Sequence, residues 1–110
     1  MSPEVVEVIV TGNDAEWMGR FVGSLVKDRI IACGNVSGPI RSIYRWHGNI
    51  EDQAEVRATL HTRAAQVPAI IERANKEHAY EVPCVIAMPI AAGNPAYLAW
   101  IISETDEPRE

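Results

Sequence analysis

Apolar and polar residues alternate at the start of the chain. Within residues 4–11, Val6, Val8 and Val10 share one face, because successive side chains of a strand point to opposite sides of a sheet. The stretch is also rich in β-branched residues, which favour strands. It predicts a first strand with one buried face.

The spacing of the apolar residues then becomes that of a helix, which is predicted to end near residue 28. Asn13 followed by Glu16 resembles a capping box, a usual signature of a helix start. The apolar stripe of this helix comprises Ala15, Met18, Phe21, Val22, Leu25 and Val26. Gly19 and Gly23 lie on the same helix and predict close packing against a sheet, since each costs about 1 kcal/mol relative to alanine.

A long hairpin is predicted in the middle of the chain. Its first arm covers residues 40–46, with a bulge or bend before it at Gly38-Pro39, where a missing backbone donor does least harm. The turn is predicted at residues 47–49. The returning arm alternates between inward apolar and outward polar residues, namely Val56, Ala58 and Leu60 against Arg57, Thr59 and His61.

The first arm ends in two aromatic residues. Tyr44 and Trp46 point to the same side of the strand and Arg45 to the other. A projecting hairpin exposes strand edges, which need a cover or a partner. In a domain this small, we expect another subunit to provide it.

The second half of the chain predicts a helix, a short strand and a last helix. The helix covers residues 65–77. The strand at 84–88 lacks alternation and is predicted to be buried on both faces. Asn94-Pro95 is a strong helix start. The acidic end, residues 104–110, is predicted to be a frayed tail.

This order of elements predicts an α+β fold of the ferredoxin-like, split βαβ type. One antiparallel sheet would carry two helices on one face, an extended central hairpin and an additional C-terminal helix. The chain of 110 residues is expected to form a single domain, residues 1–110. Such a short chain buries only about 60–70% of its unfolded surface, so association between copies is an expected source of stability.

The net charge and the cysteine content limit which binding partners and which cell compartment are expected. The formal net charge is −5, whereas nucleic acids and anionic membranes attract basic patches, so neither is an expected partner. No apolar run approaches the roughly 20 residues that span a bilayer, and residues 1–4 lack the features of a signal peptide. We therefore expect a cytoplasmic protein with Cys33 and Cys84 as reduced thiols.

Motifs of catalysis and of structural metal sites are missing from the sequence. There is no G-x-S-x-G, no glycine-rich phosphate loop, and no CxxC, HxxxH or HExxH spacing. An enzyme and a preformed, high-affinity structural metal site are therefore not expected, and no cofactor is expected to be firmly bound.

Several segments together resemble the CutA family, whose members are named for divalent-cation tolerance. The matching segments are Ala32-Cys33-Gly34-Asn35, Ser42-Ile43-Tyr44-Arg45-Trp46 with Gly48, Thr62-Arg63, His78 with Tyr80-Glu81-Val82-Pro83, and Ala92-Gly93-Asn94-Pro95-Ala96-Tyr97-Leu98-Ala99-Trp100. The resemblance implies a ferredoxin-like subunit, a homotrimer with strands that pair between subunits, and an architecture similar to PII-type signal proteins. It implies binding of copper or other divalent ions and no settled enzymatic activity.

The chain departs from the family pattern at several positions. Asn49 and His61 stand where lysines are common, His47 where glutamate is common, Ala79 where proline is usual, and Cys84 where an acidic residue is frequent. These changes weaken a ligand site that needs the lysines, and they alter the set of possible metal ligands.

Cys33 is the main metal candidate, because a thiolate is a soft ligand that selects Cu(I) or Zn. The alternative is burial without function, since cysteine is among the most buried residues. His78 and Glu81 are candidate co-ligands, although a histidine at a helix end also bonds the last carbonyls. Cys84 is expected to lie in the core.

The other candidates depend on contacts between subunits. His47 and His61 are too far apart to be neighbours in one subunit, and a trimer could bring either close to another subunit's metal ligands. A second set of side chains is expected either in an intersubunit interface or in a cleft between subunits, namely Tyr44, Arg45, Trp46, Tyr80 and Trp100. Arg45 and Arg63 could hold an anion, or form surface contacts or salt bridges.

Our leading prediction is a cytoplasmic homotrimer that binds copper or other divalent ions and contributes to the response to metal ions. The alternative is a PII-like regulatory or scaffold trimer that binds a small anionic ligand or a protein partner in its intersubunit clefts. A purely structural trimer without a ligand is a third possibility.

Overall fold

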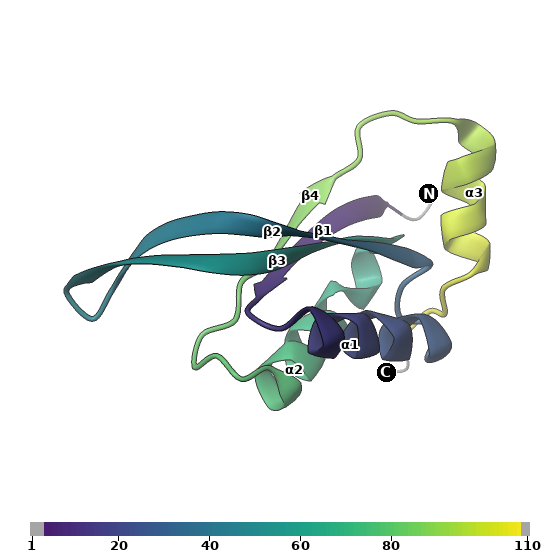
Figure 1. The fold of residues 1–110 in the computed structure, drawn as a ribbon. Helices are drawn as coiled ribbons and strands as arrows, with labels where there is room; N and C mark the ends of the chain where they lie inside the picture. Colours follow the sequence, from purple (N-terminus) through teal and green to yellow (C-terminus); the bar gives the residue numbers. More distant parts are fainter. Residues whose placement is uncertain (1–3, 109–110) are drawn as a thin grey trace.

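The chain forms an antiparallel sheet flanked by helices (Figure 1). The structure is a computed structural model that describes residues 4–108. The elements in this range are β1 (Val5–Gly12), α1 (Ala15–Lys27), β2 (Cys33–Trp46), β3 (Asn49–Arg63), a 3₁₀ turn (Ala64–Gln66), α2 (Val67–Glu77), β4 (Val85–Pro89) and α3 (Pro95–Ser103). The strand order is β2-β3-β1-β4, with antiparallel neighbours throughout. The predicted ferredoxin-like α+β fold is confirmed.

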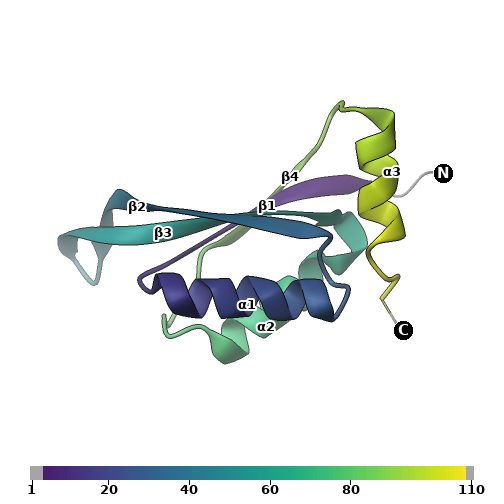
Figure 2. The same ribbon diagram turned by 45° about the vertical axis from the view of Figure 1, so that its right-hand side comes forward.

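Helices α1 and α2 lie on the same face of the sheet, and α3 stands at the end away from the hairpin tip (Figure 2). The main core lies between the sheet and the first two helices. Its fully buried members include Val8, Val10, Met18, Leu25, Leu60 and Ile70. A smaller cluster under α3 contains Val5, Ala32 and Ile101. Within residues 4–108, none of the helices combines the length and the hydrophobicity that a membrane span requires.

Helix α1 begins one residue later than its sequence signature suggested. The side chain of Asp14 caps it by accepting a hydrogen bond from the Trp17 backbone N–H at 3.1 Å, so the predicted cap at Asn13 is wrong. Gly19 and Gly23 are exposed, and a Cβ added at either would meet no atom within 4 Å. The predicted close packing at these glycines is therefore also wrong.

Close backbone packing occurs instead at Gly34 on β2. A Cβ at this position would lie 2.5 Å from Cγ1 of Val22 on α1 and 2.8 Å from Cδ2 of Leu60 on β3. Real Cβ atoms do not approach other carbon atoms so closely, because dense protein interiors leave no such overlap. The absence of a side chain at Gly34 thus allows β2 to pack closely against α1.

The long hairpin is confirmed. His47 and Gly48 form a two-residue turn with φ of 48° and 80°, which is the type I′ geometry that matches the twist of paired strands. The pairing of β2 with β3 shifts register between Ser37 and Ile40. This shift is the bulge expected at Gly38-Pro39.

Strand β4 lies at an edge of the sheet, paired on one side with β1. Ile86 and Met88 are 54% and 41% exposed in the single chain. The prediction that this strand is buried on both faces is wrong for the single chain. Its apolar residues therefore form an uncovered edge, as does β2 at the other side of the sheet.

The segment after α3 is held against the body of the chain. Thr105 is buried, and the Asp106 backbone N–H donates to the Arg29 carbonyl at 2.9 Å. Arg63 is buried as well, and its guanidinium donates to Thr105 Oγ1 and to the carbonyls of Ile102 and Thr105. The prediction of a frayed tail from residue 104 is therefore wrong for the residues up to Asp106. Residues 109–110 of the predicted tail lie outside the described range.

Candidate functional site

A row of polar side chains crosses the sheet on the face away from α1 and α2. Cys33 on β2 pairs in register with His61 on β3, which in turn pairs with Glu7 on β1. Their strand neighbours Gly34 and Leu60 face the helical core, so these three side chains point to the opposite side. Together with Tyr97 of α3 they form what we call the Cys33–His61 cluster.

Short distances join the members of this cluster. Cys33 Sγ lies 3.6 Å from Nδ1 of His61 and 3.3 Å from the Tyr97 hydroxyl. The same hydroxyl lies 2.7 Å from His61 Nδ1. On the other side of the ring, His61 Nε2 lies 2.9 Å from Glu7 Oε2. Since a carboxylate only accepts, Nε2 carries the proton of the neutral ring and Nδ1 is free to accept.

Tyr97 is expected to ionise far above its ordinary range. The hydrogen bond with Cys33, then burial and the charges of Cys33 and Glu7, raise the pKa of Tyr97 to about 12. A difference titration of tyrosinate absorbance between the parent protein and Tyr97→Phe isolates this group. Cys33→Ala should lower its pKa toward the ordinary value of about 10. A value near 10 in the parent protein would contradict the hydrogen bond.

The same shift makes folding depend on pH at the alkaline end. The unfolded chain ionises Tyr97 near pH 10, while the folded chain keeps it protonated to about pH 12. The folded state thus binds the extra proton between these values. The stabilisation is fully present below about pH 10 and is lost as the pH rises toward about 12.

The predicted co-ligands of Cys33 lie elsewhere. His78 is buried, its Nε2 donates to the Thr11 carbonyl at 2.8 Å, and its Nδ1 accepts from the Tyr80 N–H at 3.0 Å. Both ring nitrogens are therefore occupied. Glu81 is exposed and lies 3.7 Å from His47 Nε2 at the hairpin tip. The structure does not bring Cys33, His78 and Glu81 together in one chain.

The two other histidines also meet their partners within the single chain. His61 contacts its own chain's Cys33, and His47 lies beside its own Glu81. A neighbouring subunit is not needed for either contact. Among residues 4–108, no three His, Cys, Asp or Glu side chains are arranged as a complete metal site.

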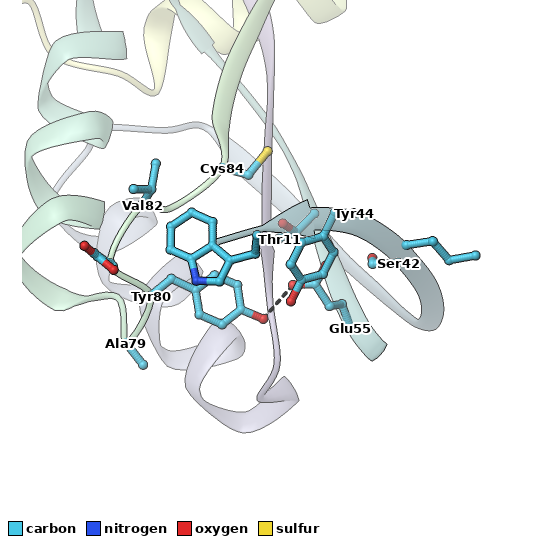
Figure 3. A pocket seen from close by; sticks show the side chains of 11 residues that line it. Thr11, Ser42, Tyr44, Glu55, Ala79, Tyr80, Val82 and Cys84 are labelled. Atoms are coloured by element: carbon cyan, nitrogen blue, oxygen red, sulfur yellow. Dashed lines mark hydrogen bonds between the residues drawn. The ribbon is translucent and has the colours of Figure 1, made fainter. Parts of the chain in front are cut away.

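A cavity of about 640 Å³ lies between the hairpin and the segment that leads into β4 (Figure 3). It is lined by Thr11, Ser42, Ile43, Tyr44, Trp46, Glu55, Ala79, Tyr80, Glu81, Val82 and Cys84. The Tyr80 hydroxyl donates to Glu55 Oε2 at 2.6 Å. Burial and this hydrogen bond raise the pKa of Tyr80 well above its ordinary range. Cys84, expected in the core, is only partly buried and lines this cavity.

Three of the predicted cleft residues, Tyr44, Trp46 and Tyr80, do line one cavity, whereas two do not. Arg45 points away from it, as the alternation along β2 predicted. Trp100 stacks on Tyr97 with 5.6 Å between ring centroids, beside the Cys33–His61 cluster. Arg63, considered as an anion ligand, is instead buried in its contacts with the C-terminal segment.

Sequence reasoning missed Glu7, His61 and Tyr97 as partners of Cys33. Two of them follow from the strand register, which can be counted only when the size of the bulge at Gly38-Pro39 is known. Counting back from the His47-Gly48 turn through a one-residue bulge sets Cys33 opposite His61, and Glu7 follows in the next strand. The position of Tyr97 depends on how α3 docks, which no local pattern specifies.

Comparison with known proteins identifies the family. The family described as CutA1 divalent ion tolerance protein matches residues 6–104. The rice protein "Protein CutA 1, chloroplastic" is 37% identical over 105 residues, which cover 96% of this chain and 59% of the rice protein. The chain thus spans about three fifths of that relative's length. "Divalent-cation tolerance protein CutA" of Thermus thermophilus is 35% identical over 90% of this chain and 97% of its own.

Solved structures agree with the sequence match. The crystal structure of CutA1 from Oryza sativa superimposes with a TM-score of 0.93 at 34% identity, covering 97% of this chain and 98% of the other. The structure of the divalent cation tolerance protein from Thermus thermophilus gives a TM-score of 0.89 at 33% identity, covering 93% and 99%. With a matched fold and a family match from residue 6 to residue 104, the chain belongs to the CutA1 divalent ion tolerance protein family.

Proposed function

We propose that this chain is a non-catalytic, homotrimeric protein that binds copper or a divalent ion such as zinc, with Cys33 Sγ and His61 Nδ1 as the first two ligands. The observation that supports this most is the 3.6 Å separation of these atoms across two paired strands. Zinc-type bond lengths of about 2.3 Å to sulfur and 2.0 Å to nitrogen, at a tetrahedral angle, separate two ligands by about 3.5 Å. The pair thus needs little movement to share one ion.

The surroundings of the pair favour this role. A metal-binding histidine usually donates its second ring N–H to a carboxylate, which fixes the tautomer and orients the ring. Glu7 accepts from His61 Nε2 in this way at 2.9 Å. The Tyr97 hydroxyl, within 3.3 Å of both ligand atoms, is a candidate third donor. A thiol with an imidazole suits copper and zinc rather than magnesium or calcium.

The trimer is proposed from the edges of the sheet. β2 and β4 are different strands and both edges are open in a single chain. Exposed apolar residues gather there and on the hairpin, namely Ile43, Ile50, Ile86 and Met88. Pairing of two unlike surfaces is a head-to-tail contact, which gives a closed ring when the rotation between copies allows it. A ring of three is the assembly that the sequence resemblance implies.

The anionic-ligand alternative has less support. The cavity beside Tyr44 contains the carboxylates of Glu55 and Glu81, and no lysine or arginine is among its lining residues. An anion would meet repulsion there. We also propose a reducing compartment such as the cytoplasm, because Cys33 binds metal only as a thiolate, which a disulfide-bonded cysteine cannot supply.

Native mass spectrometry of the metal-stripped protein, followed by sub-stoichiometric Cu(I), tests the proposal. We expect a trimer that takes up one copper per subunit. Cys33→Ser should abolish stoichiometric binding, and His61→Phe, which removes the second ligand, should weaken it by more than the roughly 10- to 100-fold that is typical when only a ligand's supporting group is lost. Glu7→Gln should weaken it less, because it changes the support of the ring and leaves both ligands in place.

Matched control variants distinguish copper binding at this site from unspecific copper binding to any thiol or imidazole. Cys84→Ser and His47→Ala remove the same groups elsewhere and should leave the stoichiometry unchanged. Copper uptake that survives Cys33→Ser would refute the thiolate site. A folded monomer at micromolar concentration would refute the trimer.

A further inference from the structure

The cavity between the hairpin and residues 79–84 has an acidic interior. Glu55 is 7% exposed, and its carboxylate accepts from the Tyr80 hydroxyl at 2.6 Å. Within residues 4–108 it forms no ion pair with a lysine, arginine or histidine. A carboxylate this buried is expensive to keep without a positive partner. Glu81, at the same cavity, adds a second acidic group.

Aromatic rings make up much of the same cavity. Tyr44, Trp46 and Tyr80 line it together with Glu55. Figure 3 shows the rings of Tyr44 and Tyr80 beside the Glu55 carboxylate, with the hydroxyl of Tyr80 directed at it. Aromatic faces carry negative charge density and attract cations, with tryptophan the strongest. The rings and the carboxylate thus both favour a positively charged ligand.

The chemistry of the lining distinguishes between kinds of cation. A metal ion needs several ligand atoms at short range, and the described residues contain no group of three His, Cys, Asp or Glu side chains placed to hold one. An organic ammonium ion needs one counter-charge and apolar walls around its alkyl groups. The volume of about 640 Å³ lies within the range of small-molecule sites.

We infer that this cavity binds a small organic ammonium ion, with the positive nitrogen beside Glu55 and its alkyl groups against Tyr44, Trp46 and Tyr80. This site shares no residue with the Cys33–His61 cluster, so it does not depend on the proposed metal function. It differs as well from the anionic-ligand alternative, because the charge it selects is opposite. The net charge of −5 adds a general attraction for cations.

Calorimetric titration of the full chain with choline and with butylammonium tests the inference. The control ligand is the uncharged tert-butyl isostere of choline, in which carbon replaces the nitrogen. We expect saturable binding of at least one ammonium, and at least about tenfold weaker binding of the isostere, consistent with a desolvated cation–aromatic contact. Added salt should weaken ammonium binding.

Variants locate the site. Glu55→Gln keeps the shape and an acceptor for Tyr80, and should raise the Kd about tenfold or more, as should Trp46→Leu. Glu16→Gln on the exposed face of α1 and Cys33→Ser should leave the Kd unchanged; circular dichroism checks that each variant folds. Any of three results would overturn the inference: no saturable binding of either ammonium, equal binding of the uncharged isostere, or a Kd that neither cavity variant changes.

If ammonium binding fails in this way while copper binding is intact, the inference about the cavity is wrong and the metal proposal stands.

Discussion

Replacing Arg63 with methionine is expected to lower the free energy of unfolding by about 3 kcal/mol and to loosen α3. Arg63 sits at the end of β3 with its side chain only 8% exposed. Its Nε donates to Thr105 Oγ1 at 3.0 Å, and its Nη2 donates to the Ile102 and Thr105 carbonyls at 2.6 and 2.7 Å. Methionine fills similar space and supplies no donor, so the carbonyls of Ile102 and Thr105 would both lose the hydrogen bond from the guanidinium.

Denaturant unfolding measures the loss, and hydrogen exchange of the α3 amides shows whether it is local. Arg20→Met is the matched control, because Arg20 is exposed on α1 and should tolerate the change within about 0.5 kcal/mol. If both variants lose the same small amount, Arg63 does not hold the C-terminal segment as described.

Adding one methyl group is expected to have opposite effects at two glycines. Gly34→Ala should destabilise the fold by about 1–3 kcal/mol, since its Cβ would fall 2.5 Å from Val22 Cγ1 and 2.8 Å from Leu60 Cδ2. Both contacts belong to the main core, so relief requires β2 and α1 to separate. The variant should unfold at lower denaturant concentration with little change in its helix content beforehand.

Gly19→Ala is the matched change on an open surface. No atom lies within 4 Å of the new Cβ, and the position is inside α1. Alanine is the better helix former, so this variant should gain about 0.4–1 kcal/mol. Destabilisation of similar size at both positions would show that the close approach at Gly34 is not the cause.

Local patterns in the sequence were enough for the fold. The alternation at Val6, Val8 and Val10, the helical stripe through Met18, and the start at Asn94-Pro95 each reflect a short-range rule that tertiary contacts reinforce. The errors came where burial depends on position in the sheet. The strand predicted at residues 84–88 was expected to be buried because it is apolar throughout, yet β4 lies at an edge of the sheet in a single chain.

The candidate site was harder to predict because register decides it. A hairpin paired without interruption from the His47-Gly48 turn would set Cys33 opposite Thr62, a residue of the buried core. The bulge at Gly38-Pro39 shifts the pairing by one residue, and such a shift exchanges the two faces of a strand. His61 therefore faces Cys33 only because of that bulge, and its size could not be read from the local sequence.

The Cys33–His61 cluster joins four elements that are distant along the chain. Glu7, Cys33, His61 and Tyr97 come from β1, β2, β3 and α3 and meet only after all four have docked. A ligand that contacts several members of the cluster at once therefore binds the folded state more tightly than the unfolded chain, and the difference between the two binding free energies adds to the stability of the whole fold. A bound ligand would thus stabilise the docking of α3, near the end of the chain, against β1, near its start.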